Sequence, residues 1–203
     1  MLISTPSLKS PAVSTYLLLI EPRKDLQERI QHIKQEFYTR YKVFEDTLSH
    51  SSLSLVRYSQ FQGFETRIVQ HLRNIAKQTA PFSIDLKDFG SLPSHTIFIN
   101  VATTIAFQNL VKNIRTPLQN LMKQDKDHKP HFMPGSNITI AHRLRPWQYE
   151  QGWQEYSTKY FSGSFIATTM TLLKKDQDAH KYNPLEVFEF QNTPIYAKQA
   201  TLF

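Results

Sequence analysis

Two short segments of the sequence carry pairs of polar side chains that could bind one anion together. Ser52 and Ser54 flank Leu53, Asn137 and Thr139 flank an isoleucine, and both segments have the pattern of β-strands. Residues i and i+2 of a strand face the same side of a sheet, so each pair would present its polar groups in one direction. Three hydroxyls and one carboxamide could then hydrogen-bond to a phosphate group.

None of these four side chains titrates near neutral pH, so proton-transfer chemistry would need another residue. His50 is a candidate, because it shares the strand parity of Ser52 and Ser54 if that strand extends backwards. Two residues along a strand displace a side chain by roughly 7 Å, which argues against a simple replacement.

Two residues after the second segment have opposite expected directions. Arg143 is in phase with Asn137, so regular pleating would turn it toward the same site, where it could help to bind a phosphate or simply be a solvated strand end. His142 is out of phase and is expected to point away, as a structural histidine with satisfied hydrogen bonds.

The other motifs favour neither a metal nor a cofactor. His128 and His131 have a His-x-x-His spacing, but Pro130 and the surrounding polar loop offer no helical face on which both could bind zinc. His95 is interpreted as a residue at the entry of a strand. The sequence has no cysteine and only 5 glycines, and it contains no glycine-rich phosphate-binding loop.

Composition favours a reducing compartment and a partner that carries phosphate. Lys and Arg number 24 against 17 Asp and Glu, a formal net charge of +7, which favours RNA or nucleotide phosphates but also fits a solvated basic surface. The longest early apolar run, residues 16–20, is too short for a signal peptide or membrane span. A cytoplasmic location without membrane contact is expected, while protein partners and oligomeric state stay open.

The apolar periodicities predict an alternation of strands and helices. Strands are expected at about 16–20, 51–58, 82–86, 96–101, 137–143, 161–173 and 185–190. Helices are expected at about 23–38, 64–77 and 104–122 and from Pro146 onward, where the proline suits a first turn. Gly90 would lie between the strands of a hairpin, and Pro117 would kink or split the third helix.

This order of elements is that of an α+β protein built from two similar lobes. Residues 1–15 are expected to be an irregular lead-in, 16–193 a single domain, and 194–203 a tail without a clear pattern. No long linker separates the two lobes.

The two polar segments also resemble the motifs of a known superfamily. Ser52-Leu53-Ser54-Leu55-Val56 resembles the first His-x-Thr/Ser motif of 2H phosphoesterases, with serine in the histidine position. The second motif is similar to Pro134-Gly135-Ser136-Asn137-Ile138-Thr139-Ile140-Ala141, with asparagine in the histidine position. Together with the strands and helices around them, they follow the order and spacing of bacterial 2'-5' RNA ligase-like proteins from about residue 16 to 190.

The resemblance implies two pseudo-symmetric lobes whose antiparallel sheets form a central groove, with helices packed outside. In this family the two histidines act as general acid and base on 2′,3′-cyclic or 2′-5′ phosphodiesters, and the Thr or Ser helps to hold the phosphate. The implied reading is a catalytically impaired protein that binds an RNA end, a cyclic phosphate or a nucleotide through Ser52, Ser54, Asn137 and Thr139. Whether it is an enzyme stays open, because it could be an active cyclic phosphodiesterase that uses a displaced residue such as His50, or a non-catalytic protein-interaction module.

Overall fold

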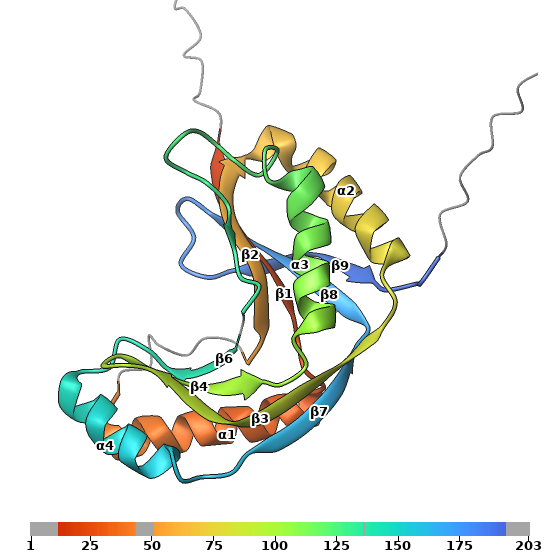
Figure 1. Ribbon diagram of the computed structural model, residues 1–203. Coiled ribbons are helices and arrows are strands. Elements are labelled where there is room, and N and C mark those ends of the chain that lie inside the picture. The colour runs from red at the N-terminus through yellow and green to blue at the C-terminus, as the bar shows by residue number, and fades with distance from the viewer. Residues whose placement is uncertain (1–11, 44–50, 136, 194–203) are drawn as a thin grey trace, which may run out of the picture.

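The computed structural model describes residues 12–43, 51–135 and 137–193 and shows an α+β fold (Figure 1). The strands are β1 (Val13–Ile20), β2 (Leu53–Phe61), β3 (Phe82–Leu92), β4 (Thr96–Val101), β5 (His131–Phe132), β6 (Ile138–Ala141), β7 (Ser162–Ala167), β8 (Thr169–Asp176) and β9 (Asn183–Glu189). The α-helices are α1 (Lys24–Tyr41), α2 (Glu65–Gln78), α3 (Ile105–Leu118) and α4 (Pro146–Tyr156), and a short 3-10 helix, η2 (Gln62–Phe64), precedes α2. Within these ranges, no helix has the length and apolar character needed to cross a membrane.

The strands form two antiparallel sheets, which we call sheet A and sheet B. Sheet A has the strand order β5-β2-β1-β8-β9, and sheet B has the order β6-β4-β3-β7. Helices α2 and α3 lie beside sheet A, whereas α1 and α4 lie along sheet B (Figure 1). The chain leaves sheet A for α1 after β1 and returns from sheet B to sheet A between β7 and β8, so strands of the two sheets alternate along the chain.

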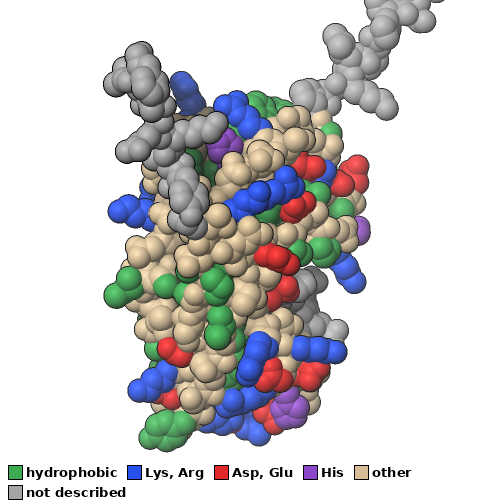
Figure 2. Space-filling view, turned by 90° about the vertical axis from the view of Figure 1, so that its right-hand side faces the viewer, with side chains coloured by type: hydrophobic (Ala, Val, Ile, Leu, Met, Phe, Trp, Pro, Cys, Tyr) green, Lys and Arg blue, Asp and Glu red, His purple; other side chains and the backbone are tan. Residues whose placement is uncertain are grey.

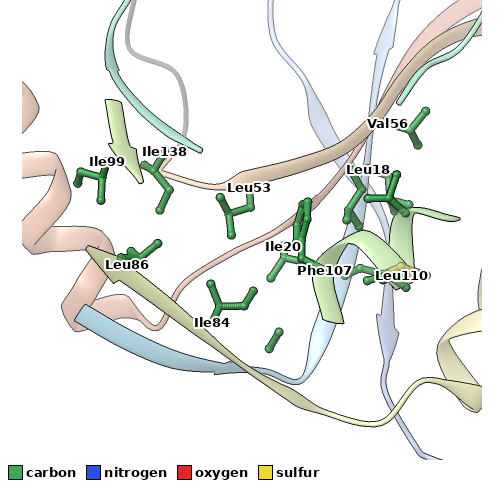
Figure 3. Close-up of a cluster of buried hydrophobic side chains, with 14 of the residues drawn as sticks. Leu18, Ile20, Leu53, Val56, Ile84, Leu86, Ile99, Phe107, Leu110 and Ile138 are labelled. Atoms are coloured by element: carbon green, nitrogen blue, oxygen red, sulfur yellow. The ribbon is translucent and has the colours of Figure 1, made fainter. Parts of the chain in front are cut away.

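A single hydrophobic core joins the two sheets. Figure 3 shows side chains of sheet A and sheet B gathered in one cluster together with side chains of α3. The labelled members of this cluster are Leu18, Ile20, Leu53, Val56, Ile84, Leu86, Ile99, Phe107, Leu110 and Ile138. Because both sheets bury their side chains in this core, their strands are fixed relative to each other, including the strands that carry the polar pairs.

Helix α4 is attached to α1 by specific contacts at its start and its middle. Pro146 occupies the first turn as predicted, where the missing N–H costs nothing. The Gln148 side chain accepts a hydrogen bond from the Arg145 backbone N–H at 2.9 Å and donates one to the Tyr41 carbonyl at 2.9 Å. At Gly152 an added Cβ would lie 2.7 Å from the ring of Phe37, so only glycine allows this close approach.

Two predictions about helix and turn breakers were wrong. Gly90 lies inside β3 opposite Phe98, and a Cβ there would be 2.5 Å from that ring, so glycine serves packing and not the turn. The turn lies instead at 93–95, where Ser94 has a φ of 70°. Pro117 does not split α3 into two helices, because it is the second-last residue of the helix and removes only one terminal hydrogen bond.

The prediction of one continuous strand at 161–173 is also wrong. It forms two strands, β7 in sheet B and β8 in sheet A, with the change at Thr168. The Thr168 carbonyl accepts a hydrogen bond from the Phe190 N–H at 2.8 Å, which fixes this crossing point. Periodicity cannot locate such a crossing, because both strands are apolar and no turn residue separates them.

Candidate functional site

A pocket of about 270 Å³ lies between β2 and β5 of sheet A and β6 of sheet B, and we call it the inter-sheet pocket. Three of the four polar residues singled out from the sequence line it together. Its lining residues are Ser54, His131, Phe132, Met133, Gly135, Asn137 and Thr139. The structure therefore brings side chains from the two segments, more than 80 positions apart in the sequence, to one site.

The position of Ser54 follows from the pairing of β2 with its neighbours. Leu53 and Leu55 on either side of it are fully buried, whereas Ser54 is half-buried and faces the pocket. The Leu55 carbonyl accepts a hydrogen bond from the Met133 N–H at 2.9 Å. This bond holds the segment that follows β5 against β2 and thereby forms one wall of the pocket.

On the opposite side, β6 presents Thr139 and the residue before the strand, Asn137. Ile138 and Ile140 are fully buried, and Thr139 is half-buried and paired with Phe98 of β4. Asn137 is half-buried and also lines the pocket. Both residues therefore offer polar groups to the space that Ser54 faces.

Helix α1 supports β6 from the other side. The Tyr38 hydroxyl donates a hydrogen bond to the Ile140 carbonyl at 3.1 Å, in the middle of β6. Lys34, one turn earlier on the helix, is fully buried, and this burial lowers the pKa of its amine to about 8. The strand that carries Thr139 is thus fixed by a buried polar contact as well as by the core.

The expectation for Arg143 fails because β6 is not regular. Thr139 pairs with Phe98 whereas Ala141 pairs with Ile97, so one extra residue lies between the pairs and reverses the alternation beyond it. Arg143 has a φ of 54°, is exposed and does not line the inter-sheet pocket.

His142 also differs from its expectation as a satisfied structural histidine. Its Nδ1 is buried and has no hydrogen-bond partner in the part of the chain that the structure describes. Burial lowers the pKa of the His142 imidazole, and the positive charges of Arg143 and Lys34 lower it further.

The remaining candidates of the first segment are not among the described residues that line the inter-sheet pocket. Ser52 is half-buried and lies one residue before β2, so the strand alternation does not extend to it, and it does not line the pocket. His50 lies outside the described residues, as does Ser136 beside Asn137. Among the described residues, no group of three or more histidines and carboxylates could hold a metal ion.

The structure places one histidine in the pocket that sequence reasoning missed. His131 belongs to β5, where it pairs with Arg57 of β2 and lines the inter-sheet pocket. The neighbouring Phe132 lies under Arg115 of α3, at 5.8 Å from its guanidinium carbon to the ring centroid. A strand of two residues has no readable period, so only the position of His131 near the second segment could have suggested this role.

Comparison with known proteins identifies the family of the chain. A family model described as the 2'-5' RNA ligase superfamily matches residues 22–179. The chain belongs to this superfamily. That membership confirms the resemblance to 2H phosphoesterases inferred from the two segments, and the α+β fold with two antiparallel sheets agrees with it.

Solved structures with this superfamily's fold cover most of the chain. Escherichia coli LigT complexed with 3'-AMP is similar over 88% of this chain and 98% of its own, with a TM-score of 0.57 and 14% identity. LigT complexed with NADP+ has a TM-score of 0.56 and 16% identity over 88% and 99%. TT0787 of Thermus thermophilus has a TM-score of 0.56 and 15% identity over 87% and 98%. No curated protein matches the sequence significantly.

Proposed function

We propose that this member of the 2'-5' RNA ligase superfamily is catalytically impaired and binds an RNA end, a cyclic phosphate or a nucleotide in the inter-sheet pocket. The observation that carries the proposal is the convergence of Ser54, Asn137 and Thr139 on one pocket from two different sheets. Two hydroxyls and a carboxamide can donate hydrogen bonds to phosphate oxygens, and none of these three side chains carries a negative charge that would repel the phosphate. The structures of LigT complexed with 3'-AMP, NADP+ and ATP support a ligand of this class.

The impaired catalysis follows from the residue types at the two motif positions. In the alignment proposed from the sequence, Ser52 and Asn137 stand where the superfamily has its histidines. Neither a hydroxyl nor a carboxamide exchanges protons near neutral pH as an imidazole does. A positioned acid or base contributes about 10² to 10⁴ in rate, so the loss of both would leave binding as the main activity.

The test of this proposal is the substitution Thr139→Val, which removes a hydroxyl but keeps the shape of the side chain. A hydrogen bond to a charged group contributes about 1.5–3 kcal/mol, so we expect the affinity for a 2′,3′-cyclic nucleotide to fall by roughly 10- to 100-fold. Isothermal titration calorimetry measures this change.

The matched control is Thr116→Val in α3, because Thr116 is exposed and its hydroxyl bonds only to the Lys112 carbonyl of its own helix. This variant should bind like the unmodified protein. Equal affinities for the Thr139 variant, the control and the unmodified protein would show that the nucleotide does not bind in the inter-sheet pocket. That result would favour a protein-interaction module.

A second candidate function is cyclic phosphodiesterase activity with a displaced histidine, and the position of His131 in the pocket favours it. Its imidazole would take a proton from water while the water oxygen bonds to phosphorus. The bond from phosphorus to one ribose oxygen would break, and that oxygen would take a proton from solvent. His50, the displaced residue suggested by the sequence, lies outside the described residues.

The substitution His131→Asn separates this second candidate from the first. If the unmodified protein hydrolyses a 2′,3′-cyclic nucleotide, we expect His131→Asn to lower kcat by about 10² to 10⁴, because it removes the proton acceptor. His128→Asn is the control, since His128 lies in the loop just before β5 and forms a hydrogen bond with Asp125. Turnover that persists in the His131 variant would assign the chemistry to another residue.

A further inference from the structure

The face of sheet A that carries Ser54 continues away from the inter-sheet pocket. In β1, Leu19, Leu17 and Thr15 alternate and therefore lie on one face. Their partners in β2 are Ser54, Arg57 and Ser59, respectively, and cross-strand partners share a face. Arg57 thus lies on the same face as Ser54, next to the pocket residue His131, with which it pairs.

The same face carries a second cation two strands away. Lys175 of β8 pairs with Thr15, and Leu173 pairs with Leu17, so Lys175 extends this face beyond β1. From the strand spacing of about 4.8 Å and a rise of about 3.3 Å per residue, Arg57 and Lys175 are roughly 12 Å apart along the sheet. Lys175 therefore lies farther along the sheet from the strands that line the inter-sheet pocket than Arg57 does.

Neither cation is neutralised by an acidic side chain within the described residues. On the helix-covered side of the same sheet, Lys174 pairs with Glu65 at 2.9 Å, and on α2 Arg73 pairs with Glu186 at 2.8 Å. Figure 2 likewise shows acidic and basic side chains interspersed on the face that it displays. In contrast, Arg57 and Lys175 form no ion pair with any of the described residues, so both can bind an external anion.

An aromatic ring lies beside Lys175. The Lys175 amine is 5.5 Å from the ring centroid of Tyr182, which precedes β9. Burial raises the pKa of the Tyr182 hydroxyl, and the positive charge of Arg57 opposes this shift. Two cations on one sheet face, with a half-buried tyrosine beside one of them, are the usual elements of a site for single-stranded nucleic acid, where cations bind phosphates and rings stack on bases.

We propose that Arg57, Lys175 and Tyr182 form a strand subsite that binds the nucleotides next to the terminal phosphate. The ligand class is then a single-stranded oligoribonucleotide and not a mononucleotide. This inference rests on the proposed function, because the inter-sheet pocket supplies the site for the terminal phosphate. Glu189 of β9 pairs with Thr169, which lies at the opposite end of β8 from Lys175 and on the same face. Its negative charge would repel phosphates, so we do not expect the bound strand to extend that far.

The experiment compares two ligands with the same end: a 2′,3′-cyclic mononucleotide and a single-stranded hexaribonucleotide with a 2′,3′-cyclic phosphate. The variant is Arg57→Gln/Lys175→Gln in the full chain, and the charge-matched control is Arg67→Gln/Lys77→Gln on α2. We expect the variant to bind the hexamer at least 10-fold more weakly and the mononucleotide within twofold of the unmodified protein. The slope of log affinity for the hexamer against log salt concentration should fall by about 1.4, since each phosphate contact contributes about 0.7 for single strands.

An equal loss for both ligands, or a loss no larger than that of the control, would overturn the strand subsite. Thr139→Val distinguishes this failure from failure of the proposed function. If Thr139→Val leaves mononucleotide binding unchanged while the charge variant still weakens hexamer binding, the pocket proposal fails and the strand subsite stands. If Thr139→Val weakens both ligands and the charge variant weakens neither, the pocket stands alone.

Discussion

Replacing Ser52 and Asn137 together with histidine is expected to raise the rate of 2′,3′-cyclic nucleotide hydrolysis by at least about 100-fold. The substitutions would place two imidazoles at the positions that the proposed alignment assigns to the superfamily's histidines, and each general acid or base contributes about 10² to 10⁴ in rate. The side chains of Ser54 and Thr139 already line the pocket in which we propose that the phosphate binds. The measurement is the steady-state rate at pH 7, followed by chromatography of the product.

The two single variants show which of the two positions contributes more to the gain in hydrolysis rate. Asn137 lines the inter-sheet pocket and Ser52 does not, so Asn137→His should contribute more of the gain than Ser52→His. A matched control is Asn100→His on β4, outside the residues that line this pocket. A double variant that folds and binds the nucleotide but remains as slow as the control would show that the proposed alignment of the motifs is wrong.

Between pH 8 and pH 10 the protein is expected to become more stable, by roughly 2 kcal/mol, because of Lys34. Burial lowers the pKa of Lys34 to about 8 from its usual value of 10.5. In this window the unfolded chain binds a proton that the folded chain has released, so the free energy of unfolding rises with pH. One pKa unit corresponds to about 1.4 kcal/mol, which sets the size of the effect.

Lys34→Met removes the titrating group and should flatten this rise. Urea unfolding at pH 7, 8, 9 and 10 measures it, with Lys24→Met at the exposed start of α1 as control. Above pH 10 the unfolded chain ionises tyrosines that the fold keeps protonated, among them Tyr41, whose pKa burial raises to about 12, so stability should fall again. Parallel curves for the Lys34 variant and the control between pH 8 and 10 would contradict the assignment.

Much of the fold could be predicted from the sequence because its elements have clear periods. The apolar residues of α1 and α2 recur at helical spacing, and Leu26, Ile30 and Ile68 are buried as that spacing requires. The chain order of strands and helices, together with the two polar segments, was enough to indicate the superfamily, which the family model confirms. The convergence of Ser54 and Thr139 on one pocket was expected from this same reasoning.

The incorrect predictions arise where pairing across the sheets, and not local pattern, decides the structure. The irregular pairing between Thr139 and Ala141 reverses the expected direction of Arg143, because regular alternation holds only without a bulge. No local pattern predicts a strand at His131, because β5 has only two residues and depends on its pairing with β2. Partners distant in the sequence determine both features, so no local window reveals them.

The most direct test of the account is to locate the bound ligand on the chain. Amide chemical-shift mapping by NMR, with a 2′,3′-cyclic nucleotide titrated into the protein, makes this measurement. We predict that the largest saturable shift changes occur at Ser54, His131, Asn137 and Thr139 around the inter-sheet pocket. Changes centred instead on the shallow surface pocket of α1 lined by His32, Thr39 and Arg40, or the absence of any saturable change, would contradict it.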